Sequence, residues 1–251
     1  MRIDLELETT RFQNLVRAVS INGTIETPML RFQPNRVKAI NKDIANVVLA
    51  CAIFRDRYFI NFQADIGNEE ELKVGFNAEK LLKICRQLSD ETTKVHIEPE
   101  SHKIEIKTDS QEVSAPIVES FTEMKSVPSM EIKEDTIEFT DSPMLIEQIP
   151  GLKKEIESLG ESETRFIVKN GELSVQQESV DGYSFAQKLK KGLNVEDFSV
   201  LAASDYLSAI FSSMITNDMI EIRLTKDFPL GFMDRDDSYV YAVLLAPRIE
   251  D

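Results

Sequence analysis

The sequence has no tryptophan, two histidines, two cysteines and nine glycines among its 251 residues. Cys51 and Cys85 each stand among apolar residues, so we expect buried thiols in a reducing compartment and no disulfide framework. His96 and His102 share one predicted hairpin without any Cys-x-x-Cys, His-x-x-His or His-Glu-x-x-His motif, which predicts surface histidines and no zinc site. No P-loop, Gly-x-Gly-x-x-Gly stretch or nucleophile elbow is present, so the sequence predicts no cofactor and no enzyme.

Long apolar runs are also missing. No stretch of about 18 apolar residues exists, so no membrane-spanning helix is predicted. Residues 1–5 lack the apolar core and small-residue cleavage site of a signal peptide. Apolar residues nevertheless make up 42% of the chain, which is enough for a real core. We therefore expect a folded protein, of two medium domains or one large one, that stays inside the cell.

Basic residues are scarce. The 29 lysines and arginines face 44 aspartates and glutamates, which gives a net charge of -15. Proteins that hold DNA by contact are usually basic, because counterion release supplies most of their affinity. Either this protein does not bind nucleic acid, or it encloses DNA and needs only a local basic lining. Aromatic residues make up 8% and do not interleave with the basic residues, so base stacking on single strands is not indicated.

Alternation of apolar and polar residues is the commonest pattern along the chain. It occurs at 94–98, 103–107 and 165–169 and predicts strands with one buried and one wet face, typical of antiparallel sheets. The segment 98–102 joins two of these strands, and Asn170-Gly171 is a strong turn signal after the third.

Helical spacing of apolar residues replaces this alternation in four segments, 12–19, 81–88, 145–159 and 207–214. Asn77, Ser142 and Ser204 are the expected N-caps of the last three. Pro150-Gly151 interrupts the third segment, which predicts a kink or two short helices there.

The two halves of the chain follow the same plan. A strand leads into a capped helix at Asn77 and again at Ser204, about half the chain later, which indicates an internal duplication. Residues 116–133 have weak periodicity and two prolines and are expected to form an extended connector. The predicted fold class is α+β, with domains at 1–115 and 134–251, each having antiparallel sheets and two helices. The polar faces of the predicted helices are basic, at Arg11, Arg17, Lys80, Lys83, Arg86, Lys153 and Lys154.

The C-terminal sequence Leu-Leu-Ala-Pro-Arg-Ile-Glu-Asp, residues 244–251, resembles the ending of archaeal and eukaryotic sliding clamps of the PCNA family. Four further stretches resemble the same family in the right order, so the resemblance runs from end to end. They are residues 38–43, 75–84, 204–208 and 227–230.

This resemblance implies the DNA clamp fold and a non-enzymatic processivity factor for DNA replication and repair. Three protomers, as a homotrimer, would form a six-domain ring with helices inside and sheets outside. The ring would encircle duplex DNA regardless of sequence and tether polymerase, clamp loader, nuclease and ligase through PCNA-interacting peptides. An archaeal or viral cytoplasmic setting is implied, or a nuclear one in a eukaryote. A closed ring also explains the charge, since topology holds the DNA and the lining only has to offset repulsion.

Three sets of residues follow from the resemblance. Lys83 and Arg86 match basic pore-facing positions, with Lys80, Arg11, Arg17, Lys153 and Lys154 added from helix faces. Residues 208–216 depart from the family, since Ser212 stands where many relatives carry lysine. The partner pocket would comprise Ile40, Ile44, Met124, Val127, Pro128, Pro229, Leu230, Leu244, Ala246 and Pro247. The subunit interface would pair Gln111, Val113 and Ala115 with the segment 182–187 that contains Tyr183 and Phe185.

Other interpretations stay open at this point. The pocket residues could simply fill the core, and the basic residues could be ordinary solvated faces. The chain could belong to a heteromeric checkpoint or repair ring, or bind clamp partners without encircling DNA. It could also be an acidic hydrolase that holds a metal through Asp234, Asp236 and Asp237, although a solvated turn is the expectation for that cluster.

Overall fold

The computed structural model describes residues 1–119, 124, 127–140, 145–150, 163–178, 184–216, 219–226 and 228–248. None of the helices among these residues is both long and apolar enough to cross a bilayer. Helices and strands alternate along the first half as follows: β1 (Arg2–Glu8), α1 (Thr9–Ser20), β2 (Met29–Gln33), β3 (Arg36–Lys42), β4 (Val48–Arg55), a short 3-10 turn (Asp56–Tyr58), β5 (Asn61–Asp65), β6 (Leu72–Gly75), α2 (Ala78–Cys85), β7 (Thr92–Glu98), a second 3-10 turn (Pro99–Ser101), β8 (Lys103–Lys107) and β9 (Glu112–Pro116).

The second half begins with a short hairpin and then repeats much of this order. Its elements are β10 (Met130–Ile132), β11 (Ile137–Phe139), β12 (Leu145–Pro150), β13 (Glu163–Lys169), β14 (Glu172–Glu178), β15 (Ser184–Lys191), β16 (Phe198–Ala203), α4 (Ser204–Ser213), β17 (Met219–Leu224), β18 (Leu230–Arg235) and β19 (Tyr239–Leu245). β10 begins inside the segment 116–133 that the sequence predicts as a connector. The predicted domain boundaries themselves stay a prediction.

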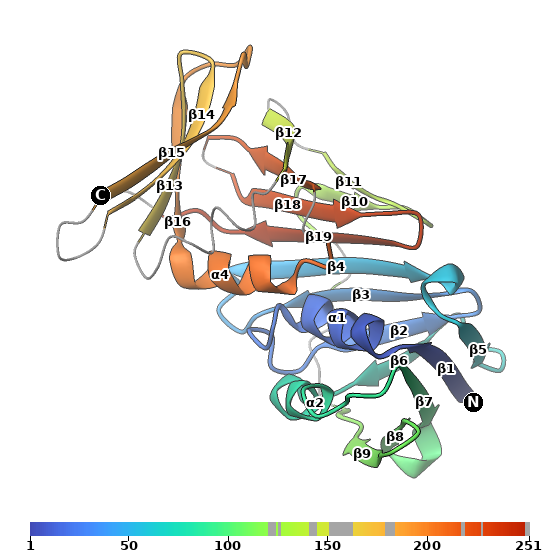
Figure 1. Ribbon diagram of the computed structural model, residues 1–251. Coiled ribbons are helices and arrows are strands. Elements are labelled where there is room, and N and C mark those ends of the chain that lie inside the picture. Colours follow the sequence, from blue (N-terminus) through green and yellow to red (C-terminus); the bar gives the residue numbers. More distant parts are fainter. Residues whose placement is uncertain are drawn as a thin grey trace.

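Three larger sheets, antiparallel throughout, make up the described fold. Their strand orders are β5-β1-β7-β8-β9, β12-β17-β18-β19-β4-β3-β2-β6 and β15-β14-β13-β16. In the eight-stranded sheet β19 pairs with β4 over seven residue pairs, which joins strands from both halves of the chain. Figure 1 shows this sheet running through the middle of the molecule, with the other two sheets at its ends.

The strand orders confirm the internal duplication. The order β6-β2-β3-β4 in the first half repeats as β16-β13-β14-β15 in the second, and β1-β7-β8-β9 repeats as β12-β17-β18-β19. Buried polar residues repeat as well, because Asn41 and Gln177 occupy the same place on the equivalent strands β3 and β14. The chain is therefore α+β with two similar halves, as the sequence predicts.

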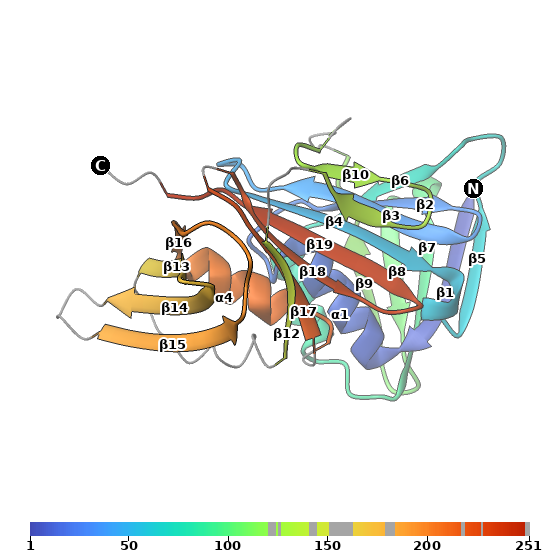
Figure 2. The ribbon, with the colours of Figure 1, turned by 90° about the horizontal axis from the view of Figure 1, so that it is seen from above.

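The two faces of the eight-stranded sheet are covered differently. Figure 2 shows α1 and α4 on one side of β4 and β19, and the β10–β11 hairpin on the other side. We call these the helix face and the outer face. Side chains of β4 alternate between them, so that Ala52 and Phe54 join the core under the helices while Cys51 and Ile53 join a second cluster under the hairpin.

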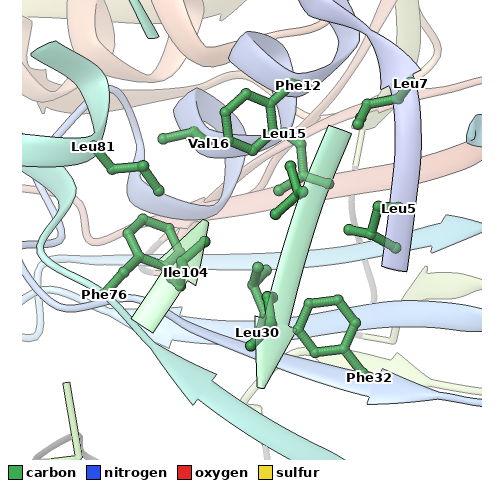
Figure 3. Close-up of a pocket in the computed structure, with 12 residues that line it drawn as sticks. Leu5, Leu7, Phe12, Leu15, Val16, Leu30, Phe32, Phe76, Leu81 and Ile104 are labelled. Carbon is green, nitrogen blue, oxygen red and sulfur yellow. The ribbon is translucent and has the colours of Figure 1, made fainter. Parts of the chain in front are cut away.

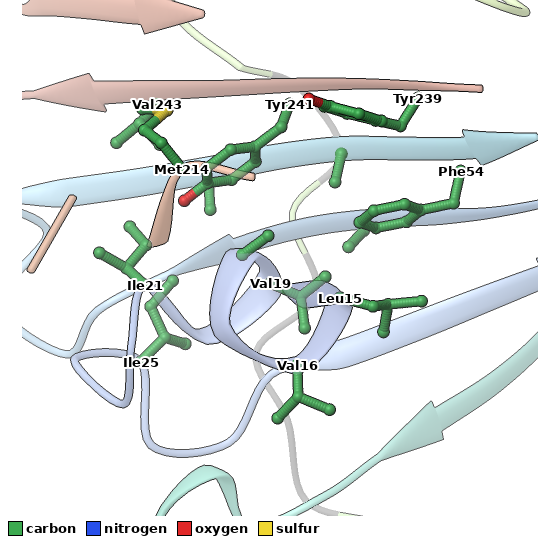
Figure 4. Packing of buried hydrophobic residues seen from close by; sticks show 14 of the residues in the cluster. Leu15, Val16, Val19, Ile21, Ile25, Phe54, Met214, Tyr239, Tyr241 and Val243 are labelled. Carbon is green, nitrogen blue, oxygen red and sulfur yellow. The ribbon is translucent and has the colours of Figure 1, made fainter. Parts of the chain in front are cut away.

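Helix α1 is the centre of the core on the helix face. Leu15, Val16 and Val19 lie along one side of the helix and are nearly fully buried. Figure 4 shows Leu15 and Val19 pointing toward β4 and β19, where Phe54 and Tyr241 lie, and Val16 pointing away from these strands. Because α1 packs against β3 and β4 and also contacts α4 of the second half, burial of its apolar stripe stabilises the junction between the halves.

A small cavity of about 20 Å³ remains in the core of the first half. Figure 3 shows the side chains that surround it, which come from the five-stranded sheet, from the eight-stranded sheet and from α1 and α2. Its lining is entirely apolar, so a void of this size offers no partner to a water molecule. It is a packing defect and not a ligand site.

Several local predictions are confirmed. The alternating segments form β7, β8 and β13, and both predicted hairpins are present. Asn77 caps α2, with its side chain accepting a hydrogen bond of 2.9 Å from the backbone N–H of Lys80. At Asn170-Gly171 both residues have positive φ, as a tight hairpin of this kind requires.

Two local predictions are wrong. Residues 145–150 form a strand paired with β17 and not the start of a helix; the rest of the predicted helix, with Ser142, Pro143 and Leu159, lies outside the described residues. Ser204 is the first residue of α4 and not its side-chain cap. Its hydroxyl instead shares hydrogen bonds with Thr164 (2.8 Å) and Gln177 (3.3 Å), because β13 and β14 pass beneath the helix start.

Candidate functional site

Helix α2 presents the clearest basic surface on the helix face. Its apolar side, at Leu81 and Leu82, is buried, and Lys80, Lys83 and Arg86 are exposed on the other side. Lys83 Nζ lies 2.6 Å from a carboxylate oxygen of Glu79 one turn earlier, so part of its charge is already balanced. Lys83 lowers the pKa of Glu79 through this hydrogen bond. The Lys83–Glu79 pair is exposed. Lys80 and Arg86 add two further positive charges, so the exposed side of α2 is basic.

The two arginines of α1 differ from each other. The Arg11 guanidinium donates a hydrogen bond of 2.9 Å to the carbonyl of Tyr58 and lies 5.4 Å from the centre of the Tyr58 ring. It is therefore held against the chain, and its charge is less free to meet a ligand than that of a solvated arginine. Arg17 is half-buried in the last turn of α1.

Helix α4 contributes no cation. Asp205 and Ser208 are its exposed residues, and no lysine or arginine occurs between Ser204 and Ser213. Lys153 and Lys154 lie outside the described residues. The described cations of the predicted lining thus come from the first half of the chain alone, from α1 and α2.

The predicted pocket residues do not all lie on the outer face. Ile40, Met124, Val127 and Leu244 belong to one cluster, together with Phe139 of the hairpin. Leu230 differs from the prediction, because its side chain is 1% exposed and belongs to the core on the helix face. Among the remaining predicted residues, Ile44 is 83% exposed, Pro128 is exposed, and Pro229, Ala246 and Pro247 are half-buried.

Phe228 was missed by the sequence analysis. It is 47% exposed directly before Pro229, which is unusual for a large apolar side chain in the described structure. Its position in the motif that resembles the family could have drawn attention to it.

Three buried or half-buried arginines fix the segment that crosses the outer face. Arg31 donates a hydrogen bond of 3.2 Å to the carbonyl of Met124. Arg36, which is 5% exposed, donates to the carbonyl and carboxylate of Glu134 and to the carboxylate of Asp135, at the tip of the β10–β11 hairpin. No local sequence pattern signals these contacts, because each joins residues about 80 or more positions apart.

Arg55 adds a third contact to the same tip. It donates to the carbonyl of Asp135 and also to the carbonyl of Asp237 in the β18–β19 turn. Gly231 allows the other end of the hairpin to lie close, since a Cβ at this position would meet the Phe139 ring at 2.7 Å. The hairpin is therefore anchored at both ends on the outer face.

The described residues of the predicted interface lie on an outermost strand or directly beside one. β9 is the last strand of the five-stranded sheet and β15 is the last strand of the four-stranded sheet. Ala115 is buried, Gln111 and Val113 are half-buried, and Phe185 belongs to β15. Tyr183 lies outside the described residues. Figure 1 places β9 and β15 at opposite ends of the molecule.

The acidic cluster near the C-terminus is not a solvated turn throughout, and this corrects the prediction. Asp234 is 1% exposed and accepts hydrogen bonds from the backbone N–H groups of Ile215 and Thr216 and from the hydroxyls of Thr216 and Tyr239, at 2.7–2.9 Å. Asp236 and Asp237 are exposed and fit the predicted turn, in which Asp236 accepts from the backbone N–H groups of Ser238 and Tyr239.

These contacts also bear on metal binding. Both carboxylate oxygens of Asp234 are engaged by protein donors, which leaves little capacity for a cation. No group of three or more metal-binding side chains occurs among the described residues. The two histidines lie beside carboxylates instead, with His96 Nδ1 2.8 Å from Asp4 and His102 Nδ1 3.0 Å from Glu119.

Comparison with known proteins finds solved structures that have the same architecture. No protein-family model matches the sequence, and no curated protein matches it. Solved structures do: the PCNA of A. fulgidus with the C-terminal region of FEN-1 bound has a TM-score of 0.76 at 18% identity, with 99% of each chain covered. PCNA from Entamoeba histolytica has a TM-score of 0.76 at 16% identity, covering 98% of this chain and 99% of that one. The PCNA2–PCNA3 complex of Sulfolobus tokodaii has a TM-score of 0.74 at 18% identity over the full length of both chains.

Proposed function

We propose that this chain, which has the fold of PCNA, is one protomer of a ring that encircles duplex DNA and tethers other DNA-handling proteins to it. The ring would act as a scaffold without catalytic chemistry of its own. Its three parts are a junction that closes the ring, a helix face that lines the hole and an outer face that binds partners.

The observation that carries the proposal is the β4–β19 junction. Inside the chain this pairing joins the two similar halves through one continuous sheet. β15 and β9 are the equivalents of β4 and β19, and both lie at an edge. Joining chains head to tail through these edges would repeat the internal junction, and a head-to-tail contact closes into a ring when its rotation is suitable. Three chains would then supply six similar halves.

The lining follows from the same geometry. Helix α1 packs on the helix face, and α2 and α4 pack against α1, so a ring of this kind would turn Lys80, Lys83 and Arg86 of α2 toward the hole. Because a closed ring holds DNA by topology, a few cations suffice to offset the repulsion from a chain of charge -15. The lining would be uneven, since α4 carries no base.

The outer face is the proposed partner surface. In the A. fulgidus structure the C-terminal region of FEN-1 is bound to PCNA. On this chain, Ile40, Met124 and Val127 are partly buried at the rim of the outer cluster, and Phe228 and Pro247 stand near the C-terminal strands. Partly exposed aliphatic and aromatic groups of this kind suit a short peptide with a few apolar anchors.

Retention on DNA of defined topology tests the proposal. The protein is mixed with bead-bound linear duplex whose free end is then blocked by a bulky protein, and the beads are washed in 1 M salt. A ring stays on blocked DNA and leaves when a restriction enzyme cuts that DNA. Equal loss from open and blocked DNA would overturn the encircling ring, because contact binding is screened at this salt.

A second arm tests the outer face. Pro247→Asp should weaken a PCNA-interacting peptide in a fluorescence titration while retention on blocked DNA is unchanged. Peptide affinity that survives this change would place the partner site elsewhere. A chain that assembles only with a second, different clamp chain would favour a heteromeric ring, the arrangement suggested by the similarity to the PCNA2–PCNA3 complex.

A further inference from the structure

A row of three basic side chains crosses the outer face of the first half. Lys73 on β6 lies opposite Arg31 on β2, and Arg31 lies opposite Lys38 on β3. The residues that flank them on each strand are buried in the core on the helix face, so strand alternation turns the three cations to the outer face. A chain with a net charge of -15 therefore carries three adjacent cations at this place.

Two of these cations serve the structure of the protomer itself. Arg31 Nη1 lies 3.4 Å and Lys73 Nζ lies 3.7 Å from the same carboxylate oxygen of Glu71. Arg31 also donates the hydrogen bond that fixes the carbonyl of Met124. Both side chains therefore have work to do without any ligand.

Lys38 differs from both neighbours. Its side chain is half-buried, and among the described residues it has no hydrogen-bond or ion-pair partner. Burial lowers the pKa of the Lys38 amine, and the neighbouring guanidinium of Arg36 lowers it further. Three carboxylates act in the opposite direction from a longer distance, but each is already paired with an arginine; they are Glu71, Glu134 and Asp135. A half-buried cation in this situation is destabilising, and an anion from outside the protomer would relieve it.

Lys38 lies at the edge of the proposed partner surface. Ile40, the next residue of β3 on the same face, packs partly buried against the second cluster, under the hairpin. On the other side, Arg31 lies opposite Lys38 and holds Met124, whose side chain packs against the same cluster. A peptide with apolar anchors on Ile40 and Met124 would therefore bring the residues next to its anchors within reach of the Lys38 amine.

The surroundings of Lys38 favour a carboxylate over a nucleic acid. The β10–β11 hairpin beside it carries four exposed acidic residues, Glu131, Glu134, Asp135 and Glu138. These would repel a long phosphate backbone, whereas one acidic side chain has to approach only Lys38. A lysine amine donates strong, charge-assisted hydrogen bonds to a carboxylate.

We propose that Lys38 binds an acidic residue next to the apolar anchors of a partner peptide, so that this chain selects partners with acidic flanks. The inference rests on the proposed partner surface and deepens it, because it adds a charge to the kind of peptide that this surface takes. Lys38 would act on specificity more than on total affinity, since one ion pair contributes little beside buried apolar anchors.

Two versions of one peptide test the acidic preference. Both carry the anchors of the PCNA-interacting peptide used above, with glutamates at both ends in one version and glutamines in the other. In fluorescence anisotropy the glutamate version should bind roughly fivefold more tightly at low salt, and this advantage should fall below about twofold in about 0.5 M salt, because the ion pair is screened. Equal affinities at low salt would overturn the preference and leave the partner surface intact. Failure of both versions to bind would overturn the partner surface and this inference with it.

Variants of Lys38 test whether this residue is responsible. Lys38→Gln keeps a polar side chain and should abolish the advantage of the glutamate version. Lys38→Glu should reverse the preference, so that a third version flanked by lysines binds roughly fivefold more tightly than the glutamate version. A merely structural role for Lys38 would not produce this reversal. Lys103→Glu, an exposed charge reversal on β8, is the matched control and should keep the preference of the starting protein. An advantage that survives Lys38→Gln would overturn the assignment to Lys38.

Two further measurements separate the alternatives. A duplex oligonucleotide should not compete with the glutamate version; competition that Lys38→Gln weakens would assign Lys38 to nucleic acid and overturn the proposal. Retention on blocked linear DNA should be the same for Lys38→Gln and the starting protein, because the ring does not depend on Lys38. Failure of the ring and failure of the acidic preference are therefore distinguishable.

Discussion

The hydroxyl of Tyr206 on α4 donates a hydrogen bond of 3.0 Å to the carboxylate of Asp43, which lies in the turn between β3 and β4. The other Asp43 oxygen accepts from the backbone N–H groups of Val47 and Val48, at 2.8 and 2.9 Å. Asp43 is 5% exposed, so these three donors satisfy a nearly buried carboxylate. The contact ties a helix of the second half to a turn of the first half, directly beside the exposed Ile44.

Tyr206→Phe should therefore loosen the junction between the halves. The aromatic ring of residue 206 is kept and only its hydroxyl is lost, so the free energy of unfolding should fall by about 1.5–3 kcal/mol, the usual contribution of one hydrogen bond to a charged group. Urea unfolding at fixed protein concentration measures this change. Ser208→Ala, also on α4 but exposed, is the control and should be neutral. A neutral Tyr206→Phe would mean that water replaces the hydroxyl at no cost.

Reversal of the α2 charges tests the lining of the hole. In Lys83→Glu combined with Arg86→Glu, two exposed cations become anions on the helix face, so threading onto DNA should slow by roughly tenfold or more at low salt. The difference from the starting protein should shrink as salt rises, because the repulsion is screened. Stopped-flow fluorescence with labelled duplex measures the rate.

The matched control for that experiment is Lys94→Glu combined with Lys103→Glu. Both lysines are exposed in the five-stranded sheet, on β7 and β8, and their reversal changes the net charge by the same amount as the α2 variant. It should slow threading far less. Equal slowing in both variants would show that overall charge, and not the α2 surface, governs access to DNA.

Arg36→Met should release the tip of the β10–β11 hairpin while leaving the apolar stem of the side chain in place. Arg36 contacts both Glu134 and Asp135, and no other arginine among the described residues contacts both. Amide hydrogen exchange in residues 130–139 should speed up by tenfold or more, whereas exchange in β13 and β14 should be unchanged. Unchanged protection of the hairpin would assign its stability to the apolar contacts of Ile137 and Phe139 alone.

The sequence predicts the regular parts of this fold because their causes are local. Strict alternation fixes β7 and β8, and Asn77 can cap α2 with a hydrogen bond only three residues away. The same spacing arguments fail at Leu145 and Ile149, which fit a helical stripe equally well. The partner that decides their conformation is β17, some 70 residues later. Periodicity within one segment cannot contain that information.

In the candidate site, too, features with a local cause could be predicted and features that depend on distant residues could not. Exposed cations on α2 follow from helical spacing alone, so Lys83 and Arg86 could be placed on a helix face without a structure. Asp234 could not be recognised as buried, because its donors Ile215 and Thr216 approach from the loop after α4. Leu230 resembles a pocket residue in sequence, yet strand parity turns its side chain to the helix face.

Alkaline pH should destabilise the fold through its buried tyrosines. Tyr58, Tyr239 and Tyr241 are 0–2% exposed, and burial raises the pKa of each phenol above its ordinary value, with Asp234 adding to the effect at Tyr239. In the unfolded chain these groups lose their protons near pH 10. Above that pH the native state binds more protons than the unfolded one, so the stability present below pH 10 is lost as pH rises, by about 1.4 kcal/mol per pH unit for each group.

Urea midpoints between pH 9 and 11, recorded with tyrosinate absorbance, check this expectation. Ionisation of these three tyrosines should coincide with unfolding. Tyr58→Phe should reduce the loss of unfolding free energy by about 1.4 kcal/mol per pH unit, because one buried tyrosine fewer then titrates. Tyrosinate absorbance equivalent to all five tyrosines in a protein that is still folded would contradict the buried assignment.

Filling the core cavity should stabilise the first half of the chain. Val95 on β7 lines the cavity, is 3% exposed and can accept one more methylene as isoleucine without losing its β-branched shape. Val95→Ile should raise the free energy of unfolding by about 0.5–1 kcal/mol, since the added group gains contacts where the lining now has none. Val95→Ala enlarges the same void and should lower it by about 2 kcal/mol. Thermal unfolding of both variants measures the pair. A lower melting temperature for Val95→Ile would mean that the void cannot admit a methylene without displacing Phe12 or Phe76, which lie on its other sides.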